Sequence, residues 1–419
     1  MVVAVLVLAG VVATPLLIGV LAPGFDGEKR ELTIHLVRIL FPGAGLLVLS
    51  AWCLGVLNSH RRFLLSYAAP IVWNAAMITT LWWYGGRSGL DDLAVLLAWG
   101  SVIGSALQCA VQVPVVLRVA PHLRCSVGAV CVHVREVMRN FVPVLISRGV
   151  VQISAYIDAM LASLLPTGAV TGIANAQLLY TLPVSLFGMS VSAAELPEMS
   201  GEATAEAIRQ RLEAGLRQIA FFVIPSTMAF LALGDVITAA LLQTGRFRPT
   251  DAYYVWGILA GSAVGLLAST LGRLYASSYY ALRDTRTPLR YALVRVTLTA
   301  ALGYVAAMHV PDLLALPLRW GAAGLTASAG VAGWVEMLLL RRTLNTRIGQ
   351  TGPQSRYVFQ VWSAASIGAA VAWAVKLALP PIHPIGAALC ILGPYGVTFF
   401  AVTWMLKIPE ATTALRRLR

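Results

Sequence analysis

The chain has 419 residues, of which 58% are hydrophobic and 12% charged, and its mean hydropathy is +0.77. A soluble protein carries about twice that charged fraction, so the composition excludes a soluble globular fold. It indicates an all-helical protein that crosses a membrane many times. The net charge of +13 would suggest nucleic-acid binding in a soluble protein. Here the basic residues lie in short loops, where anionic lipids and topology explain them, and no nucleic-acid partner is expected.

Runs of about 20 apolar residues predict twelve transmembrane helices. They cover Val2–Leu21, Thr33–Leu57, Tyr67–Tyr84, Leu93–Leu117, Phe141–Leu165, Ala169–Ser190, Ile219–Leu233, Ala252–Ser278, Tyr291–His309, Trp320–Leu340, Val358–Leu379 and Ile385–Leu406. Between the sixth and seventh, residues 201–218 place Ile208, Leu212 and Leu216 four residues apart. This spacing predicts an amphipathic helix that lies on the membrane interface and connects two halves.

The loop charges predict the orientation. The loops after the even-numbered spans, together with the C-terminal tail, hold 20 Lys and Arg residues, whereas the loops after the odd-numbered spans hold 6. Because positive residues favour the cytoplasmic side, both ends of the chain are expected in the cytoplasm.

Short similarities 221 residues apart suggest an internal repeat. Gly24 and Gly245 follow spans at this offset, and Arg62 aligns with Arg283 in the same way. Six spans separate these points, so the halves would be parallel repeats related by an axis along the membrane normal. Spans five and six then lack partners, which predicts two further helices upstream of Met1.

The predicted architecture is therefore two pseudo-symmetric lobes around a central cavity, with two extra C-terminal helices. Residues 1–138 form the remainder of the N-lobe and residues 139–350 form the C-lobe, which includes the interfacial helix 201–218. Residues 351–419 supply the last two helices and the tail.

Polar side chains within the spans mark the candidate site. A charge facing hydrocarbon costs about 2.5–3.5 kcal/mol, so such residues persist where they face a wet cavity or a partner. The predicted substrate-cavity residues are Arg148, Gln152, Asp158, Asn175, Gln177 and Arg273. A guanidinium in such a cavity suits a phosphate or pyrophosphate; the alternative is an arginine that caps backbone carbonyls between packed helices. Asp158 could neutralise a cation, bind a coupling ion or lie in water at the outer rim.

Three other basic residues lie near span ends, and the default interpretation is that they snorkel to the interface. They are Arg38, Arg295 and Lys376. No P-loop, HExxH, GxSxG or strand-borne GxGxxG occurs, and the five cysteines fit no common zinc site. The sequence thus favours a transporter over an enzyme, with no catalytic residues, no metal site and no cofactor.

Several motifs resemble those of the MurJ/MviN lipid II flippases, in the multidrug/oligosaccharidyl-lipid/polysaccharide exporter superfamily. They are APGF (22–25), RILFP (38–42), LNSHRRF to Asn74 (57–74), QISAYIDAMLAS (152–163), LPVSLFGMSVSAAELPEMS (182–200), TGRF (244–247) and YALRDTRTP (280–288). The family typically has fourteen helices, so the chain resembles helices 3 to 14. The resemblance marks Arg62, Arg283, Asp284 and Arg286 as a cytoplasmic-loop motif.

The resemblance implies transport of undecaprenyl-pyrophosphate-linked peptidoglycan precursor to the outer leaflet of the bacterial inner membrane. It also implies coupling to a cation or to the membrane potential, and contacts with membrane lipids. The family usually has essential arginines in its first two helices and an Arg five residues before the Pro of the LP motif, where this chain has Leu178. Two alternatives stay open: a related polysaccharide-lipid or drug exporter, and a non-transporting scaffold that binds cell-wall synthesis proteins.

Overall fold

The computed structural model describes the whole chain except residues 1, 61, 121–154, 202–203, 246 and 413–419. The chain divides into two units, Met1–Val150 and Val151–Arg419. The regular elements of the described residues are helices, as the composition predicts. The predicted lobe boundary at residue 138 lies outside the described residues, and the predicted domain limits remain predictions.

The described residues of the first unit form four long helices. They are α1 (Val2–Leu21), α2 (Gly27–Ser59), α3 (Phe63–Tyr84) and α4 (Leu90–Val119). Between α2 and α4, Ser50 Oγ donates to Gln112 Oε1 at 2.6 Å, and Gln108 Nε2 donates to Ser50 Oγ at 2.8 Å. Such bonds between helices satisfy polar side chains that lipid cannot solvate.

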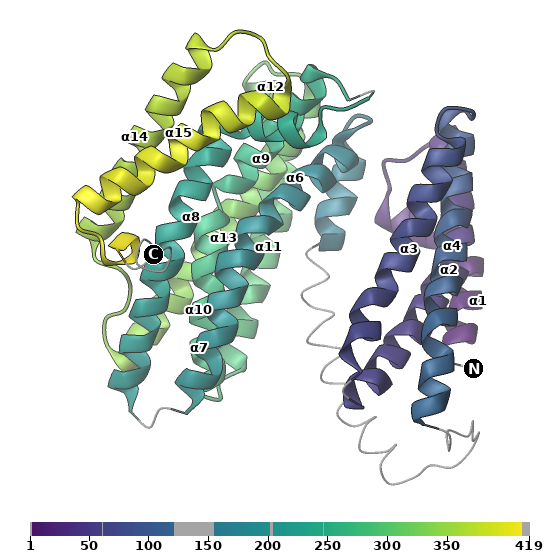
Figure 1. Cartoon of the computed structure of the whole chain (residues 1–419), viewed down its shortest axis with the longest axis horizontal. Helices are drawn as coiled ribbons and strands as arrows, with labels where there is room; N and C mark the ends of the chain where they lie inside the picture. Colours follow the sequence, from purple (N-terminus) through teal and green to yellow (C-terminus); the bar gives the residue numbers. More distant parts are fainter. Residues whose placement is uncertain (1, 61, 121–154, 202–203, 246, 413–419) are drawn as a thin grey trace. The chain divides into compact units, whose positions relative to one another are not determined.

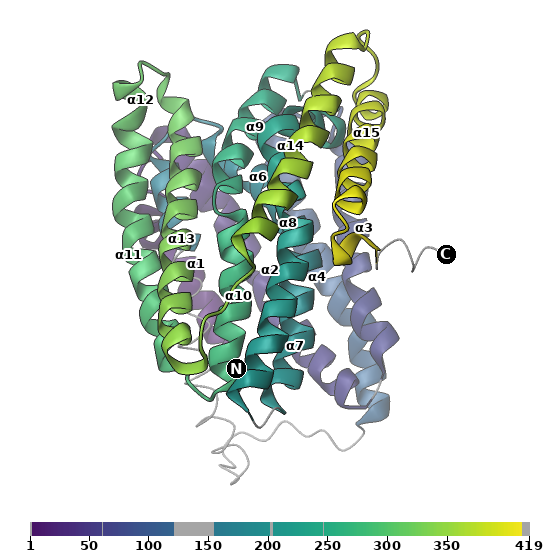
Figure 2. The same ribbon diagram turned by 90° about the vertical axis from the view of Figure 1, so that its left-hand side faces the viewer.

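The second unit begins with a helix at residues 155–163. There follow α6 (Ala169–Pro183), the π-helical segment η1 (Val184–Met189), α7 (Ser190–Ser200), α8 (Ala205–Leu242), α9 (Pro249–Ala263), α10 (Leu266–Ala281), α11 (Arg286–Met308), α12 (Val310–Leu313), the 3₁₀ turn η2 (Leu318–Trp320), α13 (Gly321–Ile348), α14 (Ser355–Ala378) and α15 (Pro384–Met405). Its main core is formed around α8 and α10. The last two helices, α14 and α15, pack against α8 (Figure 1, Figure 2).

The predicted spans agree well with the helices of the described residues. Nine helices there are long and apolar enough to cross a membrane, and α9 with α10 forms a tenth candidate that is bent by 41°. The third predicted span coincides with α3, and most of the fifth lies outside the described residues. The predicted total of twelve is therefore matched in part.

The bend between α9 and α10 divides the predicted span Ala252–Ser278. A Cβ atom on Gly265, at the bend, would lie 2.3 Å from the Gly330 Cα atom. Only a residue without a side chain permits this approach of the α9–α10 turn to α13.

The helix α8 differs from the prediction. Residues 205–218 are not a separate helix but the first turns of α8, which continues without a break to Leu242. Ile208, Leu212 and Leu216 are buried, so the apolar face is used within the protein. The side chain of Arg211 contacts Glu195 and Glu198 of α7, which provides polar partners for this extension.

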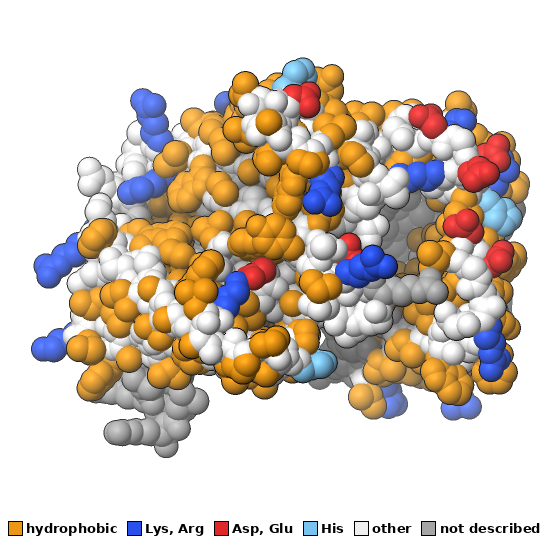
Figure 3. Space-filling view, turned by 90° about the horizontal axis from the view of Figure 1, so that it is seen from above, with side chains coloured by type: hydrophobic (Ala, Val, Ile, Leu, Met, Phe, Trp, Pro, Cys, Tyr) orange, Lys and Arg blue, Asp and Glu red, His pale blue; other side chains and the backbone are white. Residues whose placement is uncertain are grey.

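Hydrophobic side chains remain exposed where lipid would cover them. When the molecule is viewed from the end that carries α12, hydrophobic side chains cover much of the surface, with charged side chains between them (Figure 3). Along the spans themselves, Leu8 and Leu16 of α1 and Leu389 and Val397 of α15 are largely exposed. An exposed apolar surface of this extent is expected for a protein that borders on lipid.

Candidate functional site

A cluster of polar side chains lies within the second unit, and we call it the polar cluster. It consists of Asp158, Tyr180, Ser269, Arg273, Arg295 and Glu336. These residues come from helix 155–163, α6, α10, α11 and α13. The apolar sequence around each residue makes its helix a membrane span, so each polar side chain needs a partner within the protein.

An ion pair joins α11 to α13 in the polar cluster. Arg295 Nη1 lies 3.2 Å from Glu336 Oε2, and the side chains are 40% and 16% exposed. The helices α11 and α13 pack along their length, which holds the two charged groups together. The Arg295 charge is therefore neutralised by a partner within the protein.

Asp158 adds a second carboxylate beside the same guanidinium. The Arg295 guanidinium interacts electrostatically with the carboxyl group of Asp158. Its Oδ1 atom is buried and has no hydrogen-bond partner among the described residues. Arg295 is thus shared by two acidic groups, and Asp158 retains an acceptor that a proton, a water molecule or a cation could satisfy.

Tyr180 links the arginines of the polar cluster. Its hydroxyl is 2.7 Å from Ser269 Oγ, which connects α6 to α10, and both Arg273 and Arg295 act electrostatically on it. The Arg273 side chain is exposed within its unit, and no acidic side chain of the described residues lies within 4 Å of it. Its guanidinium therefore remains accessible to an anionic ligand.

The π-helical segment η1 fixes the position of α6 against α10. It follows Pro183, whose ring removes a backbone donor, and it coincides with the sequence VSLFGM. Phe187 stacks on Phe222 of α8 at 4.7 Å between ring centroids. A Cβ on Gly188 would lie 2.9 Å from the Thr270 Cγ2 atom, so α10 passes very close here, one residue from Ser269. π-helical turns frequently occur at functional sites.

Asp158 and Arg273 both belong to the polar cluster, and their role in a substrate cavity remains a prediction. Asn175 and Gln177 lie on α6, half-buried and exposed respectively. The Gln177 amide donates to Thr181 on its own helix at 3.5 Å. Arg148 and Gln152 lie outside the described residues.

The loop motif between α10 and α11 has a structural role. Asp284 accepts hydrogen bonds from the backbone N–H groups of Arg286 and Thr287, both at 3.0 Å, and from the Thr287 hydroxyl at 2.7 Å. Arg347, in the last turn of α13, contacts the same carboxylate at 2.8 Å. The bonds from Thr287, with smaller contributions from Arg347 and Arg286, hold the pKa of Asp284 well below its usual range. Asp284 therefore fixes the start of α11 and ties it to α13.

The three arginines of the loop motif are exposed. Arg283 has a positive φ of 58° in the turn after α10, a conformation that non-glycine residues seldom adopt. The Arg286 side chain is exposed at the first position of α11, and that of Arg62 is exposed between α2 and α3. A ligand-binding role for these arginines remains a prediction.

The expectation that Arg295 and Lys376 snorkel to the interface is wrong for both. Arg295 pairs with Glu336, and Lys376 Nζ lies 2.5 Å from Asp235 Oδ2 on α8. Sequence analysis missed Glu336 and Asp235. An isolated acidic residue in an apolar run would have indicated Glu336, whereas Asp235 was placed beyond the end of a span because α8 was predicted nine residues too short.

Comparison with known proteins agrees with this fold. The sequence matches the family described as "Lipid II flippase MurJ" over residues 1–403. A probable lipid II flippase MurJ from Rhizobium tropici is 31% identical over 343 residues, which are 80% of this chain and 62% of that protein. The chain thus covers less than two thirds of this relative. The lipid II flippase MurJ of Burkholderia cenocepacia is 28% identical over 97% of this chain and 80% of its own length.

Solved structures show the same fold. A lipid II flippase MurJ in an inward closed conformation superposes with a TM-score of 0.79 at 20% identity, over 97% of this chain and 81% of the other. An inward-facing multidrug resistance MATE family transporter of the MOP superfamily superposes with a TM-score of 0.62 at 17% identity, over 82% of this chain and 78% of the other. These likenesses show the fold, and the family match over residues 1–403 identifies the chain as a member of the lipid II flippase MurJ family.

Proposed function

We propose that this chain moves undecaprenyl-pyrophosphate-linked peptidoglycan precursor from the cytoplasmic to the outer leaflet of the bacterial inner membrane. The family match over residues 1–403 is the observation that carries the proposal. Relatives that align over most of this chain are named as lipid II flippases. The chain acts as a transporter and not as an enzyme, with coupling to a cation or to the membrane potential.

The polar cluster supplies a plausible contact for the pyrophosphate. Arg273 and Arg295 are balanced by Asp158 and Glu336, so the cluster is close to neutral when empty. A phosphate that approaches Arg273 gains a bidentate charge-assisted bond, and no carboxylate of the described residues has to leave that guanidinium first. We assign Arg273 to the substrate, and Arg295 to the support of Tyr180 and Asp158. Arg148, Gln152, Asn175 and Gln177 remain predicted members of the cavity.

The loop charges support an orientation with the C-terminus in the cytoplasm. In the second unit, arginines are concentrated in and beside the α7–α8, α10–α11 and α13–α14 connections. Positive residues next to a span favour the cytoplasmic side. Residues of those loops should then be protected from a membrane-impermeant reagent added to intact cells. A single cysteine introduced at residues 313–316, which connect α12 to η2, should instead react with this reagent.

Rescue of cells depleted of their own flippase tests the function. The chain should restore growth and cell shape, and it should make the lipid-linked pyrophosphate accessible to an impermeant reagent at the outer surface. An Arg273→Gln variant should insert into the membrane normally but fail to rescue. Normal rescue by Arg273→Gln would remove the proposed substrate contact, and failure of the chain to expose the lipid would favour the scaffold alternative.

A further inference from the structure

A polar pocket lies where α8 and α14 leave the apolar part of the second unit. The α8 residues 218–234 contain no charged side chain, whereas Arg217 immediately precedes them. In α14, residues 358–375 are likewise free of charge, and Tyr357 precedes them. Both residues therefore lie at the level where hydrocarbon gives way to lipid headgroups. At this end of the unit, arginines occur in the helix turns that adjoin the α7–α8 and α13–α14 connections.

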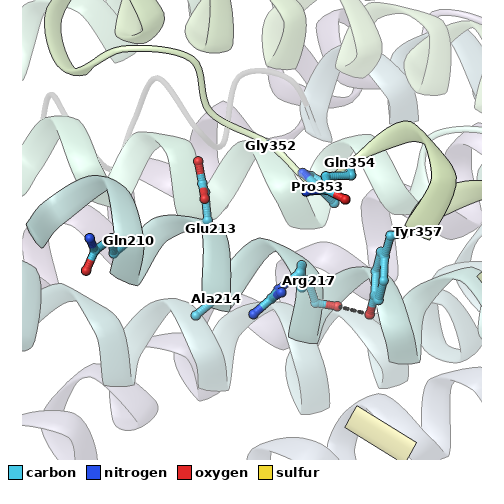
Figure 4. A pocket seen from close by; sticks show the side chains of 8 residues that line it. All are labelled: Gln210, Glu213, Ala214, Arg217, Gly352, Pro353, Gln354 and Tyr357. Atoms are coloured by element: carbon cyan, nitrogen blue, oxygen red, sulfur yellow. Dashed lines mark hydrogen bonds between the residues drawn. The ribbon is translucent and has the colours of Figure 1, made fainter. Parts of the chain in front are cut away.

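The pocket has a volume of about 340 Å³ and a polar lining (Figure 4). Two walls come from consecutive turns of α8 and from the α13–α14 connection with the first turn of α14. The lining includes Glu213 and Arg217 of α8, Gly352 of the connection and Tyr357 of α14. Charged and amide side chains at this depth can bind a headgroup without leaving the membrane interface.

The α13–α14 connection forms a preorganised wall of the pocket. Arg341 Nε donates to the Thr351 carbonyl at 2.9 Å, and the Thr351 N–H donates to Asn345 Oδ1 at 3.0 Å. Gly352 has a φ of +118°, and a Cβ there would lie 2.9 Å from the Arg341 guanidinium. In the first turn of α14, Tyr357 joins this wall to α8, because its hydroxyl donates to the Arg217 carbonyl at 3.1 Å. A ligand would therefore need little ordering of the chain.

The two charged groups of the pocket are only weakly engaged by the protein. Arg217 contacts Glu410 through Nε at 3.7 Å and is 47% exposed. Glu213 contacts Arg209 at 3.4 Å and is 37% exposed. Because Glu213 and Arg217 are four residues apart, they share one helix face and are separated by about 6 Å along the axis. The pocket thus presents a positive and a negative group about one helical turn apart.

We propose that this pocket binds the phosphoethanolamine headgroup of a membrane phospholipid. Arg217 holds the phosphate, and Glu213 accepts hydrogen bonds from the primary ammonium group. The carboxylate disfavours a purely anionic headgroup, since it would face a negative charge. A choline headgroup offers no N–H donor to Glu213 and finds one aromatic side chain, Tyr357, instead of the aromatic cage that quaternary ammonium groups prefer. The proposal does not depend on flipping activity.

Retention of phospholipid by the purified chain tests this site. The chain is reconstituted into nanodiscs that contain equal amounts of phosphatidylethanolamine, phosphatidylglycerol and phosphatidylcholine, and mass spectrometry then measures the lipid that remains bound in detergent. Wild-type protein should retain phosphatidylethanolamine preferentially. Glu213→Gln should lower this preference about fivefold, which corresponds to about 1 kcal/mol. Arg217→Gln should lower retention of all three phospholipids at the pocket.

Two variants serve as matched controls. Glu31→Gln removes an exposed carboxylate of α2 that does not line the pocket, and Arg356→Gln removes an exposed guanidinium that precedes Tyr357 but does not line the pocket. Both should retain phosphatidylethanolamine as the wild type does. Glu213→Gln is the decisive variant, because Arg217 also contacts Glu410 and its loss can lower stability. The unfolding temperature of each variant shows whether it is folded.

A soluble ligand distinguishes the two sources of this headgroup chemistry. Free O-phosphoethanolamine and inorganic phosphate are titrated into delipidated protein. Binding of O-phosphoethanolamine that is as strong as binding of the lipid would assign the pocket to a free aminophosphate and overturn the lipid. Unchanged phosphatidylethanolamine retention in folded Glu213→Gln would overturn the site itself, and loss of the preference in that variant alone, with both controls normal, would establish it.

Discussion

Arg295 on α11 and Glu336 on α13 form an ion pair of 3.2 Å between two spans that are otherwise apolar. The same guanidinium also acts on Asp158. Removal of Arg295 therefore leaves two carboxylates without their cation in a region of low dielectric constant, whereas removal of both Arg295 and Glu336 leaves only Asp158.

An Arg295→Met variant should be less stable by about 1–3 kcal/mol, because two carboxylates lose their cation. The unfolding temperature in detergent measures this loss. The double variant Arg295→Met/Glu336→Met should recover part of it. Arg290→Met, at an exposed position of the same helix, is the matched control and should unfold near the wild-type temperature. If the double variant is less stable than Arg295→Met, the loss in the single variant is not caused by the unpaired Glu336 carboxylate.

Arg273 should matter for transport more than for stability. Its side chain is exposed, so Arg273→Gln should unfold at the wild-type temperature but lower the rate of lipid exposure at the outer leaflet at least about tenfold, as expected for a lost charge-assisted contact. Arg273→Lys should recover activity in part, because it keeps the charge but not the bidentate geometry. Arg342→Gln, an exposed change on α13, should transport normally. Equal loss in both glutamine variants would indicate a general electrostatic effect.

Stability in acid should depend on Asp284. Since the pKa of Asp284 is lower in the folded chain than its ordinary value of 3.8, its bonds stabilise the fold above that value. This contribution is lost as the pH falls through the lower, folded-state pKa. The difference in unfolding temperature between the wild type and Asp284→Asn should therefore shrink as the pH falls below 3.8. A difference that does not vary with pH would show that the carboxylate charge is not responsible.

The two functions of Asp284 can be separated at neutral pH. Asn can still cap a helix start but cannot pair with Arg347, whereas Ala does neither. We expect Asp284→Asn to lose less stability than Asp284→Ala, and Arg347→Gln to lose about as much as Asp284→Asn.

Gly188 should tolerate no larger residue. A Cβ there would lie 2.9 Å from Thr270 Cγ2 and 3.2 Å from Thr270 Cβ, so Gly188→Ala should cost about 1–3 kcal/mol through overpacking. Thr270→Ser in the same chain should restore part of the stability, since it removes the closest methyl group. Gly333→Ala is the control: no atom lies within 4 Å of its Cβ position. If the Gly188→Ala variant is as stable as Gly333→Ala, α6 and α10 are less closely packed than described.

The sequence was sufficient to predict the spans because each one depends on local composition. Twenty apolar residues must become helical in lipid whatever their neighbours are, and α1, α14 and α15 follow the predicted ranges closely, whereas α13 continues eight residues beyond the predicted end at Leu340. Asp158 and Arg273 were also identified by local contrast, as charges in apolar runs.

The partners of those charges could not be predicted in the same way. Glu336 is 41 residues from Arg295 and Asp235 is 141 residues from Lys376, and their pairing depends on how each helix is rotated about its axis. The continuous α8 was missed for a related reason. Charged residues before Ile219 show where hydrocarbon ends, but they do not show where a helix ends, because a helix can continue into water when its apolar face stays covered.

The unbroken course of α8 has a mechanical consequence. Its 38 residues extend over about 57 Å, which is well beyond the roughly 30 Å of the hydrocarbon layer. The helix can therefore act as a lever that is held at Asp235 by Lys376 of α14 and that carries Glu213 and Arg217 beyond its apolar segment. A small tilt of the apolar segment would be transmitted to the end with Glu213 and Arg217 as a larger displacement.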